Sequence, residues 1–460
     1  MIDRLIGVVL IVTGVAILLR EWVGSAGAGL VAAGGILVFL VLATPRAPWS
    51  RQAFVALGLG LVAVALFTRA DWLAITVKGL EQGGFIAAFF IALASLRGPA
   101  AASPAIERCG QYLASQPPGK RYLALTTGGH LFALILSYGA ISLLGGLTES
   151  IASREPNAEI REIRNRRMLL AIQRGFVASL TWSPLAFAMA ISTSVIPGSS
   201  WSGAAVFAIF NAALVTFIGW ALDTYFKPKL TQPAPARRDP IGGWRDLKPL
   251  LALLVLLFSG VAVLELLTGL RVIAVVMLLV PTIAIGWIVI QSRGETGTAA
   301  RTATRLKRLA LIDIPSFQSE LILLVMAGFI GATGGELLQP LIADQALALD
   351  AIPVSAILVA IVWIIPLLGQ LGMNPILSVS LLAPLLPSAA AMGVSPNVVV
   401  VALTAGWALT GASSPFTATT LLIGRLGHTS AFRVGVVWNG GFMVAGLLAL
   451  SATIFLIAQL

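Results

Sequence analysis

The chain has 460 residues, of which 58% are hydrophobic and only 11% are charged. A soluble domain carries roughly 25% charged residues, so the composition excludes an ordinary soluble protein and indicates a polytopic membrane protein. The net charge of +11 falls in short segments between apolar runs, which is typical of membrane orientation rather than nucleic-acid binding. With one cysteine, Cys109, and two histidines, an intrachain disulfide and a cysteine- or histidine-rich metal site are excluded.

Several apolar runs are long enough to cross a bilayer as helices, which need about 20 residues with few charges, or fewer in a short helix. We expect such spans at residues 5–19, 24–43, 52–68, 80–96, 168–194, 202–222, 249–268, 272–292, 317–338, 397–424 and 434–458. Two further apolar stretches, 122–147 and 354–390, do not fit this simple scheme.

Lysine and arginine favour cytoplasmic loops, and this preference decides how the two stretches are interpreted. With the N-terminus in the cytoplasm, a full crossing by 122–147 would place the arginines between 154 and 167 outside, whereas a hairpin that dips in and returns keeps them inside. A hairpin at 354–390 that enters from the outer face likewise keeps Arg425 and Arg433 inside. The sequence thus predicts an all-α polytopic protein of the cell (inner) membrane with about 11 transmembrane helices, two re-entrant hairpins and an outside C-terminus.

An internal repeat relates the two halves of the chain. The segment 175–191 (GFVASLTWSPLAFAMAI) matches 406–422 (GWALTGASSPFTATTLL) at a constant offset of 231 residues, and residues 84–86 match 328–330. An odd number of predicted spans separates the equivalent elements, which predicts an inverted-topology repeat. The predicted organisation is an extra N-terminal span at 1–22, a first repeat at 23–222, a cytoplasmic linker at 223–248 and a second repeat at 249–460.

Each copy of the repeat carries a Ser-Pro step inside an apolar run. Proline removes a backbone donor and clashes with the carbonyl four residues back, so the helix must break or kink. We expect Ser183 and Ser414 as N-caps, and Pro184 and Pro415 as first-turn residues, of a second half-helix. Paired discontinuous helices indicate the midplane site of a secondary transporter. The alternative is two ordinary Pro-kinked helices whose serines bond back into the same helix.

Candidate site residues cluster around these steps. Hydroxyls and unwound carbonyls can replace the hydration shell of a cation or donate to an anion. We expect substrate binding by Ser183, Ser414, Ser413, Thr417, Thr410, Asn374 and Arg174. We expect ion coupling by Thr181, Gly411, Glu336 and Glu265. The alternatives are helix packing by small residues for the hydroxyls and snorkelling to the cytoplasmic face for Arg174.

With two hairpins that are each followed by a Ser-Pro helix, the architecture resembles the ion transporter superfamily of secondary carriers. The resemblance is strongest to the divalent anion:sodium symporter branch and its citrate, arsenite and antiporter relatives. Hairpin tips in that branch carry Ser-Asn-Thr triplets, whereas the hairpins here offer Thr126, Thr127, Ser137 and Tyr138, and then Gln370 and Asn374. The resemblance implies a site between hairpin tips and helix breaks, an elevator-like or rocking alternation, and a homodimer.

These features together predict a secondary active transporter, not an enzyme, that moves a small anionic solute coupled to Na⁺ or H⁺. No cofactor, resident metal or nucleic-acid partner is expected, and the lipid bilayer is the expected environment. A passive channel and a membrane-embedded enzyme or assembly component are the alternatives. We also expect His130 to be a structural hydrogen-bonding group and the charged run 153–167 to be a solvated helix on the membrane surface.

Overall fold

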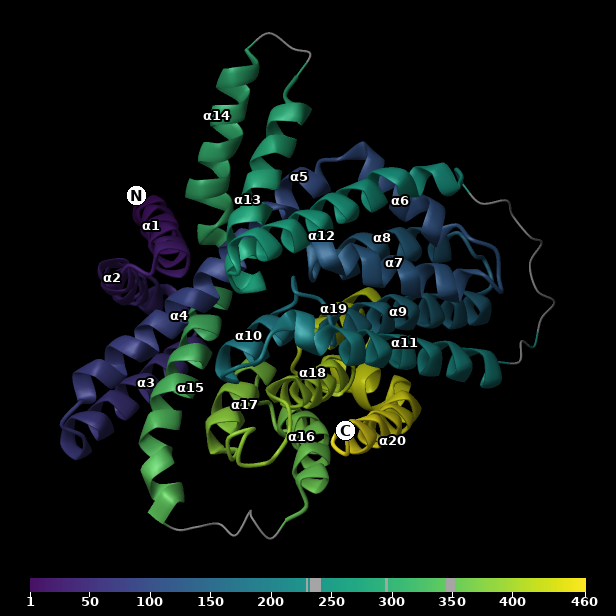
Figure 1. Cartoon of the computed structure of the whole chain (residues 1–460). Helices are drawn as coiled ribbons and strands as arrows, with labels where there is room; N and C mark the ends of the chain where they lie inside the picture. The colour runs from purple at the N-terminus through teal and green to yellow at the C-terminus, as the bar shows by residue number, and fades with distance from the viewer. Residues whose placement is uncertain (229–230, 232–240, 294–296, 345–351) are drawn as a thin grey trace. The chain divides into compact units, whose positions relative to one another are not determined.

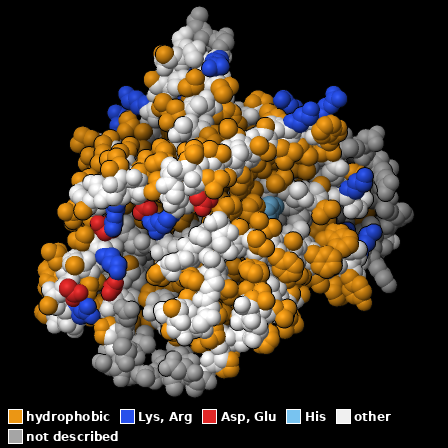
Figure 2. Space-filling view, viewed as in Figure 1, with side chains coloured by type: hydrophobic (Ala, Val, Ile, Leu, Met, Phe, Trp, Pro, Cys, Tyr) orange, Lys and Arg blue, Asp and Glu red, His pale blue; other side chains and the backbone are white. Residues whose placement is uncertain are grey.

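The structure is a computed structural model that describes residues 1–228, 231, 241–293, 297–344 and 352–460. Within these ranges the chain forms helices and connecting turns, without a β-strand. Ten helical segments of the described chain are long and apolar enough to cross a membrane. Hydrophobic side chains cover much of the surface seen in Figure 2. The protein is an all-α polytopic membrane protein, as the sequence predicts.

The chain divides into two compact units, each assembled from separate segments. Unit 1 comprises Met1–Pro99, Leu257–Leu349 and Ile376–Pro387, and unit 2 comprises Ala100–Leu256, Asp350–Pro375 and Ser388–Leu460. Each unit takes segments from both halves of the sequence, so the units do not coincide with the predicted repeats. The inverted repeat itself stays a prediction.

Unit 1 is built around one strongly buried helix, α4 (Trp72–Ser95), whose residues 83–95 are all buried. The helices α1, α2, α13 and α15 pack against it (Figure 1). A glycine with φ of 70°, Gly24, ends α1, and the Ser25 hydroxyl caps α2. The other helices of this unit are α1 (Ile2–Val23), α2 (Ala26–Ala43), α3 (Trp49–Thr68), α13 (Val272–Gln291), α14 (Thr298–Arg308), α15 (Gln318–Asp344) and α17 (Pro375–Leu382).

Unit 2 contains both Ser-Pro segments. Its helices are α6 (Pro104–Ala114), α7 (Arg121–Leu136), α8 (Gly139–Ser153), α9 (Ala158–Leu180), α10 (Phe187–Val195), α11 (Trp201–Tyr225), α16 (Val354–Gln370), α18 (Pro396–Ser413), α19 (Ala418–Leu426) and α20 (Gly440–Ile457). The short α5 (Arg97–Ala101) and the long α12 (Lys248–Thr268) cross the boundary between the two units.

The first predicted hairpin is formed by α7 and α8, which turn at Ser137 and Tyr138 and pack against each other and against α9 (Figure 1). Helix α7 approaches α9 backbone to backbone, because a Cβ at Gly175 would collide with the carbonyl oxygen of Thr126. The second stretch forms α16 and α17 on either side of a turn at Gly372. That either hairpin re-enters a membrane stays a prediction.

Two expectations from the sequence need correction or qualification. The charged run 153–167 is not a separate surface helix, because α9 begins at Ala158, is capped by Asn157 and continues without interruption to Leu180. Arg167 in this part pairs with Asp223 of α11 at 2.6 Å, which anchors the charged turns to unit 2. Residues 229–230 and 232–240 of the predicted linker 223–248 lie outside the described residues, between the end of α11 and a short turn at Trp244–Leu247.

Candidate substrate and ion site

Both Ser-Pro helices are interrupted. Helix α9 ends at Leu180 and α10 begins at Phe187, while α18 ends at Ser413 and α19 begins at Ala418. The second half-helices start at equivalent positions of the repeat, and each has nine residues. The alternative of two continuous, merely kinked helices is therefore wrong for this structure.

The N-caps lie three residues later than the sequence predicts. They are Ala186 and Thr417, whereas Ser183 and Ser414 precede them in a tight turn. Each serine hydroxyl accepts a hydrogen bond from the backbone N–H two residues later, at 3.1 Å in the first turn and 3.2 Å in the second. This local bond offers the backbone an alternative to helix, so the half-helix starts only after the turn.

Hydroxyl and carbonyl oxygens cluster at the second break. Thr417 Oγ1 lies 2.9 Å from Thr419 Oγ1 and 3.1 Å from Thr420 Oγ1. The main-chain oxygen of Ser414 accepts from Thr420 at 2.6 Å and from Thr417 at 3.0 Å, and the hydroxyl of Thr419 donates to the main-chain oxygen of Gly411. We call these five oxygen atoms the threonine cluster. It satisfies carbonyls that the break removes from the helical ladder.

Two serines connect the second break to α16. The Ser414 hydroxyl donates to the carbonyl oxygen of Gly369 at 2.6 Å. The Ser413 hydroxyl accepts from Gln370 Nε2 at 3.2 Å and donates back into α18. The C-terminal end of α16 is therefore hydrogen-bonded to the second break.

Not every predicted substrate residue has its hydroxyl directed out of its own helix. Thr410 is fully buried and donates to the carbonyl oxygen of Gly406 at 2.8 Å, within α18. Its methyl group packs against Gly369, as expected for helix packing by a small residue. Because α18 ends at Ser413, Thr417 lies beyond this helix and is the N-cap of α19.

The first break satisfies its backbone differently, through aromatic side chains. Trp201 Nε1 donates to the carbonyl oxygen of Trp182 at 2.7 Å, and Trp182 Nε1 donates to His130 Nε2 at 3.0 Å. His130 is thus a neutral acceptor in a structural hydrogen bond, in agreement with the prediction. Thr181 Oγ1 lies 3.2 Å from the carbonyl oxygen of Ala208 on α11. These contacts connect the break to α7 and α11.

The two breaks meet inside unit 2. A Cβ built on Gly411 would lie 3.1 Å from Val177 Cγ1 and 3.2 Å from Leu180 Cδ1, so the end of α18 packs on the end of α9. Gln173 Nε2 lies 3.5 Å from the carbonyl oxygen of Gly411 and 3.4 Å from that of Ala412. Residues of the first broken helix therefore bond to carbonyls freed by the second.

Arg174 does not snorkel to a surface, since it is only 5% exposed. Its Nε donates to Asn439 Oδ1 at 3.1 Å, one Nη donates to the Tyr122 hydroxyl at 3.1 Å, and its guanidinium carbon lies 4.8 Å from the Phe442 ring centre. Asn439 Nδ2 donates to Gln173 Oε1 at 3.0 Å. All these partners are neutral, so the arginine contributes a buried positive charge next to the breaks.

Sequence reasoning missed two members of this network, Gln173 and Asn439. Both are fully buried. A polar residue inside an apolar span is costly and usually functional, which is the signal that would have selected them. Asn439 also follows a π-helical turn at Arg433–Trp438, a feature frequent at functional sites.

The two predicted acidic ion-coupling residues belong to the other unit. Glu336 of α15 forms an ion pair with Lys78, and Glu265 is half-buried on α12; both belong to unit 1. Asn374 is half-buried in the turn that follows α16. The structure thus places the predicted serines and threonines, Gly411, Asn374 and Arg174 in unit 2.

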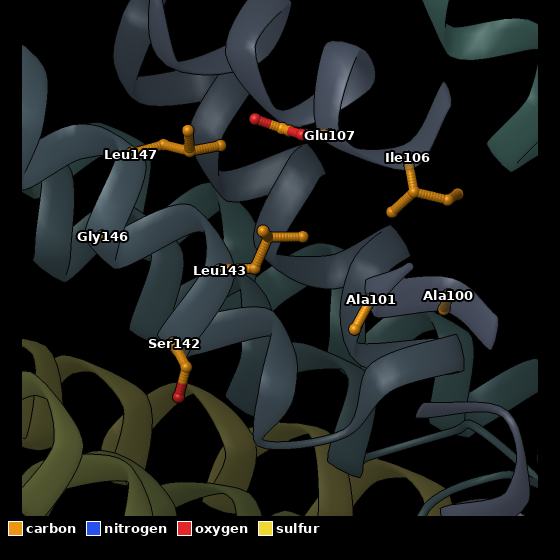
Figure 3. A pocket seen from close by; sticks show the side chains of 8 residues that line it. All are labelled: Ala100, Ala101, Ile106, Glu107, Ser142, Leu143, Gly146 and Leu147. Carbon is orange, nitrogen blue, oxygen red and sulfur yellow. The ribbon is translucent and has the colours of Figure 1, made fainter. Parts of the chain in front are cut away.

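A pocket of about 300 Å³ lies elsewhere in unit 2, between α5–α6 and α8. Figure 3 shows the mainly apolar side chains that line it, with the carboxylate of Glu107 at one side. None of the predicted site residues lines this pocket. On the neighbouring face of α6, burial raises the pKa of the Cys109 thiol to about 12.

Comparison with known proteins establishes the fold. No protein-family model and no curated protein matches the chain. The solved structure of the Alcanivorax borkumensis YdaH transporter is 17% identical, with a TM-score of 0.55 over 88% of this chain and 98% of that one. Neisseria gonorrhoeae MtrF, described as illuminating a class of antimetabolite efflux pumps, is 16% identical, with a TM-score of 0.54 over 90% of this chain and 94% of that one. The chain is similar to these transporters in fold.

Proposed function

We propose that the chain is a secondary active transporter that moves a small anionic solute coupled to Na⁺. The observation that carries the proposal is the meeting of two broken Ser-Pro helices, in corresponding positions of the two halves, within one unit. Broken helices supply half-helix ends and freed backbone groups, the parts from which secondary transporters build their sites. The similar folds of YdaH and MtrF support this assignment.

The coupling ion in this proposal binds at the threonine cluster. Oxygen atoms of hydroxyls and unwound carbonyls coordinate Na⁺ in discontinuous transporter helices. The Thr417, Thr419 and Thr420 hydroxyls bond to one another and to carbonyl oxygens, and their rotation would turn the hydroxyl lone pairs toward a bound cation. The hydrogen-bond partners of these three hydroxyls are oxygens of hydroxyls and carbonyls, without a carboxylate, which favours Na⁺ over a proton.

The solute in this proposal binds at the first break. The Ser183 hydroxyl is buried and accepts from its own turn, and the described residues offer no acceptor for its proton. The N-terminal end of α10, which follows directly, carries the positive end of a helix dipole. Arg174, with neutral partners only, adds a buried positive charge nearby along α9. These groups together favour an anion.

Proton coupling is the alternative, and the candidates for it are Glu265 and Glu336 in unit 1. Glu336 forms an ion pair with Lys78, and both acids belong to unit 1, whereas both breaks belong to unit 2. We also propose membership of the ion transporter superfamily, with inverted repeats and re-entrant hairpins, an inner-membrane location with a cytoplasmic N-terminus, and a homodimeric assembly. The succession of a helical hairpin and a broken helix in unit 2 supports that membership.

A ligand panel tests the proposal. The purified protein is heated with carboxylates, sulfate, arsenite, amino acids and antimetabolites, each with Na⁺ or with K⁺, because a bound ligand raises apparent stability by mass action. We expect at least one anion to stabilise the protein only with Na⁺, and to accumulate in proteoliposomes when a Na⁺ gradient is imposed.

Three outcomes would contradict the proposal. Uptake that does not saturate and never exceeds equilibrium would indicate a passive channel. Stabilisation by no member of the panel, together with no uptake, would favour an enzyme or assembly component. Export of an antimetabolite against its gradient would keep the transporter but reverse its direction, as the description of MtrF suggests for that protein.

A further inference from the structure

Two asparagines in unit 2 are both fully buried, yet they differ completely in their hydrogen bonds. Asn439 uses both ends of its side-chain amide. Neither Oδ1 nor Nδ2 of Asn211 has a hydrogen-bond partner among the described residues. An unpaired buried amide is rare in folded proteins and still less favourable within lipid, so it requires an explanation.

The position of Asn211 provides one. Asn211 lies on α11, one turn after Ala208, whose carbonyl oxygen is 3.2 Å from the hydroxyl of Thr181 at the first break. In an α-helix a carbonyl oxygen lies beside the side chains three and four residues later, which is why serine and threonine can bond back to it. Residues 211 and 212 therefore lie on the side of α11 that carries the contact with Thr181, and residue 212 is only an alanine.

Other polar groups of this break also lack partners. The Ser192 hydroxyl on α10 is fully buried, and no described residue bonds to it. The Ser183 proton, on the turn before α10, has no acceptor among the described residues. Unused hydrogen-bonding capacity thus occurs on α11, on α10 and on the turn that precedes it.

We propose that Asn211 binds the transported solute, and that the solute is an oxyanion with a hydroxyl or amino group beside it. The inference rests on the proposed transport function. A carboxamide presents N–H donors and a carbonyl acceptor side by side. Its Nδ2–H and the Ser183 hydroxyl donate to the oxyanion, and its Oδ1 accepts from the neighbouring hydroxyl or amino group.

This arrangement determines specificity. A site that hydrogen-bonds a substrate hydroxyl rejects an analogue that lacks it, because the buried acceptor is then left unpaired. Hydroxy- and amino-carboxylates are therefore preferred over plain carboxylates and over sulfate. Asn211 is thus the residue that distinguishes members of the anionic class.

Matched ligand pairs test this assignment. Thermal stabilisation of the full-length wild type and of Asn211→Leu is titrated with malate against succinate, lactate against propionate, and alanine against propionate, all in Na⁺. We expect the wild type to bind the substituted member of at least one pair about tenfold or more tightly. Asn211→Leu is expected to abolish that preference: it should weaken binding of the substituted member about tenfold or more, and binding of the plain carboxylate, which loses only the Nδ2–H bond, by a smaller factor.

The outcomes separate this inference from the function on which it rests. A wild type stabilised by carboxylates without any preference, or a leucine variant that keeps the wild-type preference, overturns the role of Asn211 and leaves the transporter intact. If no solute of the full panel stabilises the wild type, the proposed function fails first, and the role of Asn211 fails with it.

A second experiment compares the melting temperatures of two variants without ligand. Leucine at position 211 replaces unpaired polar atoms by apolar ones, so we expect the ligand-free melting temperature to stay the same or rise by about 2 °C. Asn439→Leu, the matched control, removes a fully bonded amide and should lower it by about 5 °C or prevent folding. A fall in Asn211→Leu as large as that of the control would show that Asn211 is a bonded structural group and would overturn the proposal.

Discussion

At the first break, the Ser183 hydroxyl only accepts from its own turn, and the Trp201 indole takes the nearby carbonyl of Trp182. At the second break, the equivalent Ser414 also donates to Gly369 on α16, and three threonines take the freed carbonyls. The two Ser-Pro turns thus differ: the Ser183 hydroxyl at the first break has no acceptor for its proton among the described residues, whereas the Ser414 hydroxyl at the second break both donates and accepts. Two segments of related sequence therefore need not have the same task, and this difference is the basis of our proposal that the solute binds at the first break and the ion at the second.

The hydrogen bonds of Gln173 connect the two breaks, and their loss should have the largest effect on the stability of the protein. Gln173→Leu removes three hydrogen bonds, to the carbonyl oxygens of Gly411 and Ala412 and from Asn439 Nδ2. We expect the free energy of unfolding to fall by about 2–4 kcal/mol. Denaturation of the purified protein followed by tryptophan fluorescence measures it.

Gln370→Leu is the matched control for that experiment. Gln370 is half-buried and donates one bond to Ser413, so its loss should cost about 1 kcal/mol or less. Equal effects of the two glutamine substitutions would show that Gln173 does not connect the breaks.

The next largest effect should be on the Na⁺ dependence of solute uptake. Thr417→Val removes the hydroxyl at the centre of the threonine cluster, and we expect the Na⁺ concentration for half-maximal uptake of the panel-identified solute to rise about tenfold or more. Thr193→Val on α10, whose hydroxyl bonds back to Met189, should leave it unchanged. A threonine cluster that merely caps the backbone would lower stability in Thr417→Val without any change in this concentration.

Substitution of the two Ser-Pro serines should affect different quantities, the free energy of unfolding for Ser414 and solute binding for Ser183. Ser414→Ala loses its bond to Gly369 and should cost about 1–2 kcal/mol of unfolding free energy. Ser183→Ala should cost about 0.5 kcal/mol or less, yet weaken solute binding about tenfold. Chemical denaturation and ligand titration of both variants measure these quantities. The reverse pattern would exchange the tasks of the two breaks.

The smallest expected effect concerns the orientation of the chain in the membrane, which shows in which of two introduced cysteines is labelled. The Cys109 thiol is buried and its pKa is raised to about 12, so at pH 7–8 it should not react with maleimides and needs no removal. In intact cells a membrane-impermeant maleimide should label Gln459→Cys and not Thr304→Cys. Labelling of the residue on α14 alone would invert the predicted topology.

The sequence was sufficient for the fold class and for the positions of the two breaks. Proline inside an apolar run has a direct steric consequence, and the repeat offset of 231 residues predicts the two breaks at equivalent positions. Nine of the eleven predicted spans agree with apolar helical segments of suitable length, and the other two, 168–194 and 397–424, are divided between α9 and α10 and between α18 and α19.

The details that failed depend on contacts between distant segments. The observed N-caps lie three residues after the predicted ones because each serine hydroxyl accepts a bond within its own turn. The local sequence does not decide between this turn and an N-cap. The positions of Asn439 and Gln173 opposite the carbonyls of α18 follow from packing of helices far apart in sequence. For the same reason, the sequence could not show that Arg174 is buried among neutral partners.

The most direct test of the division of tasks is a Na⁺ titration without solute, followed by thermal stabilisation, of the wild type, Ser183→Ala and Thr420→Val. K⁺ replaces Na⁺ at constant ionic strength. We predict that Na⁺ stabilises the wild type and Ser183→Ala equally, whereas the apparent affinity of Thr420→Val falls about tenfold or more. A sodium response that survives in Thr420→Val and disappears in Ser183→Ala would contradict the account.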